Sequence, residues 1–267
     1  MKKVYRSESN IDYWNRRWSE SGTDAKAFLD PNIYPVKYSN LIVQDKTECC
    51  LEIGSGVGRI LKHYFYQGFN ITGIERSNIG VDTMLASDKN LPVQIGDAVN
   101  LPYADSTFDN VLAFGVFHNI EDEVALKNSI SQCSRVLKPS GRFCISIRPD
   151  NLEMNLNEWY WKISGYKKQN HGNDSTTFHR WLFKKNEFQR ILSNNNLHTV
   201  KVHAARNVSI LYRIKWLRTQ NKDETYLRSN GYKLNFLGAS IDRLITFIMP
   251  NQFCNVFVFI GEKRPQW

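Results

Sequence analysis

From residue 48 onward, apolar runs of four to seven residues alternate with amphipathic stretches along the chain. This alternation predicts a parallel β-sheet flanked by helices. The apolar runs place strands at residues 49–53, 70–74, 93–95, 108–114 and 142–147, and the amphipathic stretches place helices at 57–66, 78–87 and 123–137. Pro139 and Gly141 follow the last of these helices, which is typical of a helix that stops before a strand.

The flanking segments show a different pattern. Before the sheet we expect helices over residues 9–21 and from 34 to about 45, both rich in aromatic residues. Residues 149–182 are polar and aromatic without a clean period, which indicates an insertion over the active site. A helix at 184–194, a strand at 197–203, two or three helices within 207–250 and a closing strand at 253–260 complete the pattern. The last of those helices contains the apolar run 244–249, which is too short to span a bilayer and is expected to lie in the core.

The most informative stretch is a glycine turn after the first strand. Gly54, Gly56 and Gly58 alternate with other residues directly after Glu52. Glycine permits a sharp turn from strand to helix and a close approach of the backbone to a ligand. A dinucleotide fingerprint would require a third glycine at position 59, where Arg59 stands instead. An ordinary turn remained the alternative, so the neighbouring residues have to decide.

Carboxylates follow the next two strands. Glu75 ends the second strand, 21 residues after Gly54, and can accept hydrogen bonds from ribose hydroxyls. Asp97 follows the third strand and can accept from an adenine amino group, although Asp is also a common helix cap. Ligands of doubly wound sheets bind at the carboxyl ends of the strands, where both residues would lie.

Together these motifs closely resemble the class I S-adenosylmethionine (SAM) dependent methyltransferases, in particular their type 11 small-molecule branch. Residues 101–109 (LPYADSTFD) are similar to a run that leads into the fourth strand of that family, and residues 114–118 (FGVFH) and 136–142 (VLKPSGR) extend the likeness over about 48–148. Ser140 replaces a glycine that is usual in the family. The resemblance implies a Rossmann-like, doubly wound sheet of seven strands with an antiparallel last strand.

It also implies a domain plan and a cofactor site. The plan is an N-terminal helical arm or lid (1–47), a SAM-binding core (48–148), a substrate-selecting insertion with one core helix and strand, forming a helical cap (149–250), and a closing strand (251–267). Carried over by motif position, the residues that would bind SAM, and its product S-adenosylhomocysteine (SAH), are Glu52, Gly54, Ser55, Gly56, Glu75, Arg76, Asp97, Ala98, Phe114 and Gly115, with Phe114 or Phe117 packing near the cofactor.

Methyl transfer from a sulfonium needs alignment of donor and acceptor and removal of the acceptor's proton. His118 follows the fourth strand and is the best candidate base, with a structural histidine as the alternative. Arg148 can face an anionic acceptor or form a surface ion pair. The remaining candidate substrate contacts, for which core packing or a surface position is the alternative, are Tyr13, Trp14, Trp18, Tyr38, His171, His179 and Arg180.

Charge and cysteine content bear on the partner and the cellular compartment of the protein. The chain of 267 residues carries a net charge of +9, but residues 1–150 balance to −1 and residues 151–267 to +10. The basic part is either a solubilising surface or a face for an anionic partner. Five cysteines without C-x-x-C spacing disfavour disulfides and a zinc site, and no leader or membrane span is expected, so the cytoplasm is the natural compartment.

The leading hypothesis is therefore an enzyme that methylates oxygen or nitrogen of a small metabolite. The basic C-terminal part leads us to expect an anionic metabolite. Metal-dependent chemistry is disfavoured because H-x-x-H and H-E-x-x-H spacings are absent. The alternatives are an RNA methyltransferase that uses the basic C-terminal part, and a SAM-fold binding protein without catalysis. The identity of the acceptor and the oligomeric state do not follow from the sequence.

Overall fold

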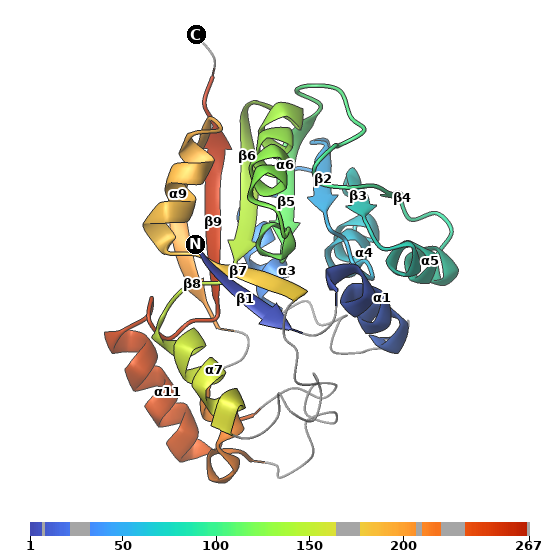
Figure 1. The fold of residues 1–267 in the computed structure, drawn as a ribbon. Coiled ribbons are helices and arrows are strands. Elements are labelled where there is room, and N and C mark those ends of the chain that lie inside the picture. The colour runs from blue at the N-terminus through green and yellow to red at the C-terminus, as the bar shows by residue number, and fades with distance from the viewer. Residues whose placement is uncertain (7–8, 22–32, 164–176, 207–209, 220–232, 266–267) are drawn as a thin grey trace.

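The computed structural model describes all of the chain except residues 7–8, 22–32, 164–176, 207–209, 220–232 and 266–267. A seven-stranded sheet runs through its centre in the order β4-β3-β2-β5-β6-β9-β8 (Figure 1). The strands of this sheet are β2 (Cys50–Ile53), β3 (Ile71–Glu75), β4 (Val93–Ile95), β5 (Phe108–Phe114), β6 (Leu137–Ile147), β8 (Leu197–Ala205) and β9 (Val256–Lys263).

Neighbouring strands from β4 to β6 pair in parallel, whereas β9 runs antiparallel to both β6 and β8. This is the doubly wound Rossmann-like sheet with an antiparallel last strand that the sequence predicted. Helices connect the parallel strands because such strands need a crossover between them. The helices of the sheet domain are α3 (Tyr34–Ser39), α4 (Arg59–Phe65), α5 (Asn78–Ser87), α6 (Glu123–Val136) and α9 (Lys185–Ser193).

Two hydrophobic clusters cover the two faces of the sheet. Alternate residues of β6 and β9 face opposite sides, as the two-residue period of a strand requires. Phe143 and Phe259 pack in the cluster that contains α6 and α9, whereas Cys144 and Val258 pack in the cluster that contains α3, α4 and α5. The sheet is therefore buried on both faces, which explains the near-continuous apolar runs of its central strands.

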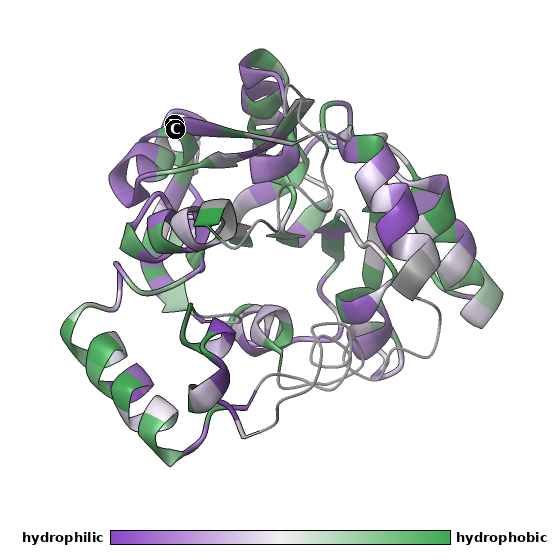
Figure 2. Cartoon of the chain, turned by 60° about the horizontal axis from the view of Figure 1, so that its bottom comes forward, coloured by the Kyte–Doolittle hydropathy of each residue, from purple (hydrophilic) through white to green (hydrophobic). Residues whose placement is uncertain are grey.

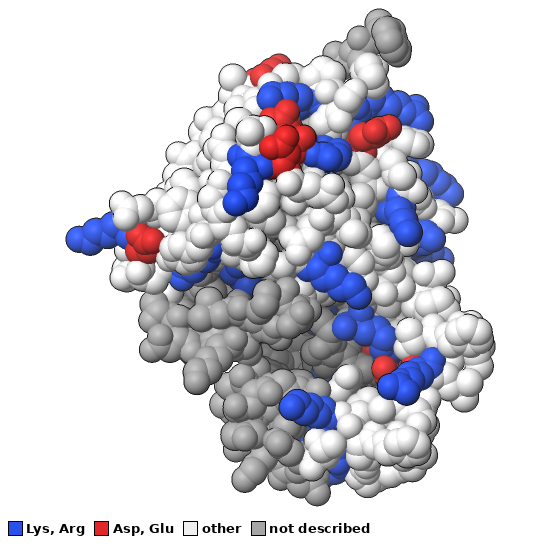
Figure 3. All heavy atoms as spheres, turned by 180° about the vertical axis from the view of Figure 1, so that it is seen from behind, with Lys and Arg blue, Asp and Glu red and all other residues white. Residues whose placement is uncertain are grey.

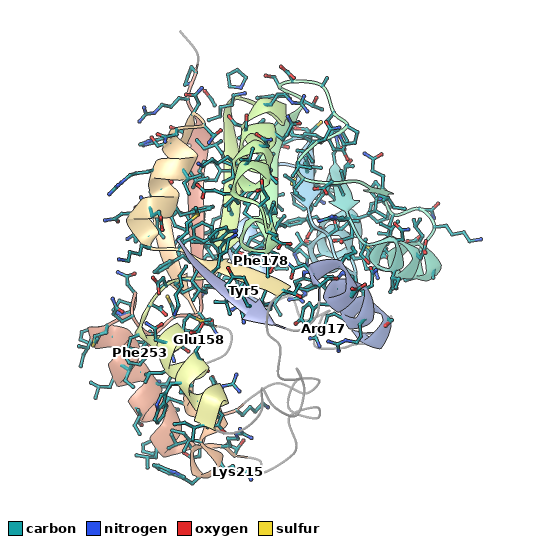
Figure 4. The ribbon with its side chains drawn as sticks, in the orientation of Figure 1. Tyr5, Arg17, Glu158, Phe178, Lys215 and Phe253 are labelled. Atoms are coloured by element: carbon teal, nitrogen blue, oxygen red, sulfur yellow. The ribbon has the colours of Figure 1, made fainter. Side chains whose placement is uncertain are left out.

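A second, smaller sheet joins the N-terminal arm to the segment predicted as an insertion. Strand β1 (Lys2–Arg6) pairs antiparallel with β7 (Thr177–Leu182). Figure 4 shows Tyr5 and Phe178, which are paired in this ribbon, in front of the main sheet. The N-terminal arm is thus a strand followed by α1 (Asn10–Ser21), not helices alone.

The remaining elements form a lobe below the sheet in Figure 1. This lobe contains α7 (Leu152–Ile163), the short 3₁₀ helices η2 (Ile210–Arg213) and η3 (Lys215–Leu217), and α11 (Phe236–Ile248). Another 3₁₀ turn, η1 (Phe117–Asn119), follows β5 in the sheet domain.

Several expectations from the sequence need correction. Residues 149–182 contain regular elements, α7 and β7, where no period was recognised. The second helix ends at Ser39, before the expected residue 45. The apolar run 244–249 is not a core helix, because the side chains of Leu244 and Phe247 on α11 are 59% and 87% exposed.

Candidate active site

A cavity of about 430 Å³ lies at the carboxyl ends of the parallel strands. Its lining comes from the loops after β2, β3, β4 and β5, from the end of β6 and from α1. The loops meet there because the carboxyl ends of parallel strands share one edge of the sheet. The predicted site residues of these loops are therefore brought together, although no sequence neighbourhood links them.

The glycine turn forms the floor of this cavity. Gly54, Gly56 and Gly58 have φ values of 75°, 60° and 82°, a left-handed conformation that favours glycine. A Cβ on Gly54 would lie 2.4 Å from Val116 Cγ2, so the turn also needs glycine for space. The helix α4 begins directly after Gly58, at Arg59, two residues later than the sequence indicated.

Glu52 is a buried carboxylate beside the turn. Its side chain is 3% exposed, and Oε2 has no hydrogen-bond partner among the described residues. Burial raises the pKa of this carboxyl to about 8. An unpartnered acceptor of this kind is costly unless a ligand completes it, so the position fits the binding of a cationic group.

Glu75 holds the turn in place. Its Oε2 accepts a hydrogen bond of 2.7 Å from the Gly56 amide, and its Oε1 accepts one of 2.9 Å from the Ser77 amide. The carboxylate is 8% exposed, and burial raises its pKa. Each oxygen retains a second lone pair, so a ligand hydroxyl can still donate to Glu75. The carboxylate thus has a structural role that the sequence did not indicate.

Asp97 lies at the mouth of the same cavity. Its Oδ2 pairs with Arg76 Nε at 3.3 Å, and its Oδ1 accepts from the Val99 amide at 3.1 Å. Asp97 does not cap a helix, because a loop and an isolated bridge to Asn100 follow it. Ala98 is 8% exposed and lines the cavity wall.

The loop after β5 supplies the opposite wall. Phe114 and Gly115 line the cavity, and a Cβ on Gly115 would meet nothing closer than His118 Cε1 at 4.0 Å. Phe117 is instead fully buried in the core cluster on the α6 side and does not line the cavity. Of the two phenylalanines that the sequence offered, the structure therefore brings only Phe114 to the site.

His118 sits on η1 at the edge of the cavity. It is 6% exposed, and its Nδ1 has no hydrogen-bond partner among the described residues. Burial, together with the positive charges of Arg148 and Arg180, lowers the pKa of His118 well below its usual value. The imidazole is therefore neutral near pH 7, with a nitrogen free to accept a proton or a hydrogen bond.

Helix α1 crosses the mouth of the cavity. The Asn10 amide nitrogen donates to the Asn119 carbonyl at 2.7 Å, and the Ser77 hydroxyl donates to Asn15 Oδ1 at 2.6 Å. These two bonds attach α1 to the loops after β5 and β3. Trp18 lies on the glycine turn, since a Cβ on Gly56 would be 2.9 Å from its ring.

The other substrate candidates divide into two groups. Tyr13, Trp14 and Arg148 line the cavity together with Trp18, and Trp14 stacks on Trp18 with ring centroids 5.1 Å apart. The remaining candidates do not line it. Tyr38 packs on His203, with centroids 4.8 Å apart, and burial raises its pKa.

The candidates from the insertion lie outside the cavity lining or outside the described residues. His179 stands on β7 with its ring 6.0 Å from that of Tyr13, and Arg180 contributes its charge to the surroundings of His118. His171 belongs to the segment 164–176, outside the described residues. Within the described residues no group of three or more His, Cys, Asp or Glu side chains could hold a metal ion.

Some cavity residues were missed from the sequence. Arg17, Tyr34 and Arg59 all line the cavity. The spacing of Arg17 with Tyr13 and Trp14, at three and four residues, would have placed it on the same helical face. Arg59 was considered only as the residue that breaks the dinucleotide fingerprint, and Tyr34 only as a helix start.

Comparison with known proteins agrees with this geometry. Residues 51–145 match a family model described as "Methyltransferase domain". A demethylmenaquinone methyltransferase of Thermotoga maritima is 34% identical over 42% of this chain and 49% of its own length. A tRNA (carboxymethyluridine(34)-5-O)-methyltransferase of Arabidopsis thaliana is 36% identical over 24% of this chain and 16% of its own length.

A solved structure of Haemonchus contortus phosphoethanolamine N-methyltransferase 2, in complex with SAM, superimposes with a TM-score of 0.61 at 17% identity. That match covers 97% of this chain and 60% of the other. Residues 51–145 thus resemble a methyltransferase domain in sequence, and the chain shares its fold with a SAM-bound methyltransferase. The chain spans about half or less of the curated relatives reported above, so their acceptors cannot be transferred directly.

Proposed function

We propose that this protein transfers the methyl group of SAM to oxygen or nitrogen of a small, anionic acceptor. One observation carries the proposal: a single cavity has buried carboxylates at its glycine turn and cationic side chains elsewhere in its lining. Glu52 and Glu75 lie at the turn, and Arg148, which follows β6, is a cation elsewhere in the lining. SAM carries an ammonium and a ribose, which match the carboxylates, and Arg148 would face the acceptor.

The residues present fit the cofactor. The unpartnered Oε2 of Glu52 would receive the ammonium group of its methionine part, and the spare lone pairs of Glu75 would receive ribose hydroxyls. Gly54 and Gly56 line the cavity, and their left-handed backbone forms the turn beside which the ligand would lie. When bound, SAM supplies an electrophilic methyl carbon on a sulfonium, so the leaving group needs no acid.

The chain's own groups would position the acceptor. Arg148 lines the cavity and donates one N–H to the Asn255 carbonyl at 2.9 Å, which fixes the guanidinium. A fixed guanidinium holds a carboxylate or phosphate with directional, charge-assisted hydrogen bonds. Helix α1, with Trp14 and Trp18, would exclude water from the bound pair.

His118 would take part in removing the acceptor's proton. His118 lines the cavity, and a nitrogen of its neutral imidazole would accept a hydrogen bond from an O–H or N–H group of the acceptor. The lowered pKa of His118 makes it a weak base, suited to orienting a hydroxyl and receiving its proton as the methyl group moves. An amine acceptor needs only to be neutral, so His118 would matter less there.

The first experiment uses SAM labelled in its methyl group, with pools of carboxylates and phosphate esters as acceptors. We expect incorporation from an anionic pool and none from matched neutral alcohols and amines. Incorporation confined to the neutral pool would contradict the anionic acceptor.

With an acceptor in hand, His118→Ala should lower kcat by about two orders of magnitude, the usual contribution of a general base, and leave the Kd of SAH unchanged. His118→Asn is the matched control, because its side-chain oxygen can accept a hydrogen bond without taking a proton. Recovery by Asn would assign His118 a positioning role, and unchanged turnover in His118→Ala would exclude any proton-transfer role.

RNA methylation is the second candidate, supported by the short match to a tRNA methyltransferase and by the balance of +10 in residues 151–267. Lys and Arg also outnumber acidic residues on the face shown in Figure 3. A filter-binding assay with bulk tRNA separates the candidates, because RNA binding is steeply salt-dependent. Salt-sensitive retention with methyl incorporation into tRNA would replace the small-molecule proposal.

A binding protein without catalysis is the third candidate. Its discriminating measurement is the melting temperature with SAM in large excess, since a ligand that binds only the folded state raises that temperature. Binding of SAM without incorporation into any pool would favour this candidate. The buried, unpartnered carboxylate of Glu52 argues for a bound cationic ligand in either case.

A further inference from the structure

Helix α11 turns its apolar side chains outward. Five large apolar residues recur along one face of this helix, and their exposed fractions are 90% for Phe236, 51% for Leu237, 59% for Leu244, 87% for Phe247 and 63% for Ile248. At 3.6 residues per turn, these positions fall within a sector of about 120° around the helix and form one stripe. We call this stripe the α11 outer face. Figure 2 shows α11 at the lower left, at the outside of the lobe and largely green.

The inward side of the same helix carries an ion pair to the rest of the lobe. Asp242 Oδ1 pairs with Arg206 Nη2 at 2.7 Å, and Arg206 also pairs with Glu153 of α7 at 3.7 Å. The Glu153 side chain is fully buried. This ion-pair network fixes the rotation of α11 about its axis, so the outward direction of the apolar stripe is determined by the fold.

The N-terminal end of α11 is also fixed. The Asn235 amide nitrogen donates to the Trp216 carbonyl at 2.7 Å, and the Asn235 backbone amide donates to the Leu217 carbonyl at 2.8 Å. A Cβ on Gly238 would lie 2.7 Å from that same carbonyl, so helix and η3 are in close contact. Trp216, 65% exposed, therefore extends the apolar surface beyond Phe236.

Cationic residues accompany this surface. Arg243 is exposed on the α11 outer face, and Lys215 and Lys233 are exposed on either side of the helix start. Figure 4 shows Lys215 at the far end of the lobe. The acidic residue of α11, Asp242, faces inward and is paired with Arg206. The outward surface of the helix thus combines large apolar groups with positive charge only.

We propose that the α11 outer face binds the surface of an anionic lipid bilayer. An apolar helical stripe with a Trp at its end and flanking Lys and Arg is the composition of helices that lie in the plane of a membrane interface. Anionic headgroups complement the cations, and the acyl boundary accepts the phenylalanines. A second copy of this face would oppose cation to cation, which disfavours self-association as the occupant.

This mode of binding is peripheral. Among the described helices, none has the length and apolar character that crossing a bilayer requires. The inference does not depend on the proposed function, because the α11 outer face lies outside the cavity lining.

Vesicle co-sedimentation of the full chain tests the proposal. The vesicles are phosphatidylcholine alone or phosphatidylcholine with about 30% phosphatidylglycerol. We expect the protein to sediment with the anionic vesicles, and the variant F236S/F247S to lose at least about tenfold in partition coefficient, since two phenylalanines leave the apolar phase. R243Q should weaken binding to anionic vesicles only.

The matched control is V124S, which removes a side chain that is 65% exposed on α6, in the sheet domain. V124S should sediment like the unchanged protein. A denaturation midpoint for each variant shows whether it is folded. Absence of sedimentation with both kinds of vesicle, or equal loss in V124S and F236S/F247S, would overturn the proposal. A dimer in solution that F236S/F247S abolishes, without vesicle binding, would assign the face to a second copy and also overturn it.

Discussion

Helices α9 and α11 are both amphipathic, yet they are built in opposite directions. On α9, Phe188 and Leu192 are fully buried against the sheet and the charged residues face outward. On α11, Asp242 faces inward and Phe247 faces outward. The difference teaches that the period of a helical pattern identifies the helix, whereas its environment decides which stripe is buried.

The contrast extends from the two helices to the regions that contain them. The sheet domain buries apolar residues on both faces of its strands. The lobe buries the polar residues Glu153 and Asn157 on α7, at 0% and 9% exposure, while Trp159 and Ile163 of the same helix are 61% and 66% exposed. The lobe therefore buries polar side chains beside apolar ones such as Met154 and exposes several large apolar residues, unlike the sheet domain.

The sharpest test applies one substitution to both helices. Phe188→Ala should lower the free energy of unfolding by about 3 to 5 kcal/mol, because it opens a cavity in a packed core. Phe247→Ala removes an exposed ring and should change it by less than about 0.5 kcal/mol. Urea denaturation of both variants measures the difference. Equal losses would show that α11 is packed in solution and would cancel the contrast.

The second test concerns charge instead of apolar area. Arg206→Gln removes a cation that pairs with the buried carboxylate of Glu153 and should lower the free energy of unfolding by about 3 kcal/mol. Arg243→Gln, on the α11 outer face, should change it by less than about 0.5 kcal/mol. The same denaturation assay compares them. A cost for Arg243→Gln similar to that for Arg206→Gln would contradict the inverted arrangement.

The third test compares two glycines with the same backbone conformation. Gly56 and Gly68 have φ values of 60° and 80°, but a Cβ on Gly56 would lie 2.9 Å from Trp18, whereas a Cβ on Gly68 would have only Lys46 Nζ nearby, at 4.0 Å. Both alanine variants should lose about 1 kcal/mol of stability from the strained φ. Only Gly56→Ala should also weaken SAH binding, and a loss of about 1.4 kcal/mol would raise the Kd about tenfold. Calorimetric titration with SAH measures this, and equal Kd values for the two variants would remove the turn from the site.

The fourth test concerns the pH dependence of ligand binding at Glu52. The pKa of Glu52, about 8 in the free protein, means that the carboxyl is mostly protonated at neutral pH. The ammonium of SAH prefers the ionised carboxylate, so Glu52 releases a proton to the solvent when SAH binds. The affinity for SAH should therefore rise between pH 6 and 8 by up to about tenfold per unit and then level off. Glu52→Gln should abolish this slope, and Glu123→Gln, on the surface of α6, should keep it. A slope that survives in Glu52→Gln would assign it to another group.

The stability of the free protein should follow the opposite sign. Since the pKa of Glu52 is raised above its unfolded value of about 4.5, the folded state holds the proton more tightly, and stability falls as pH rises through that interval. This contribution is fully present below pH 4.5 and is lost as pH passes about 8. Glu52→Gln removes it, which a set of urea denaturations at several pH values would show.

The sheet domain was predictable because its local signals agree with its burial. Strands β4 and β5 and helix α5 lie at the residues that the sequence indicated, and β2 and β3 begin one residue later. Apolar runs and the glycine turn point to the same arrangement. The expected stop at Pro139 and Gly141 was wrong, because β6 begins at Leu137 and contains both residues. The cavity followed from this, because strand ends fix which loops meet.

The lobe and the β1–β7 ribbon could not be predicted in the same way. Helix α7 has no recognisable period because its buried positions include Glu153 and Asn157, which a hydrophobic pattern counts as outward. Strand β1 is stabilised by a partner about 175 residues away, at Phe178 and its neighbours, so no local signal reveals it. Arg17 lies at the site because α1 lines the cavity, and the position of α1 relative to the sheet does not follow from local sequence.

The attachment of α1 has a kinetic consequence. The bonds from Asn10 to the Asn119 carbonyl and from Ser77 to Asn15 tie one helix to two loops of the site. A cofactor that enters past α1 needs these two bonds to open, and its residence time would then follow the opening rate of α1. At saturating acceptor, the opening of this helix would then limit kcat, and steady-state rates would not report the methyl-transfer step.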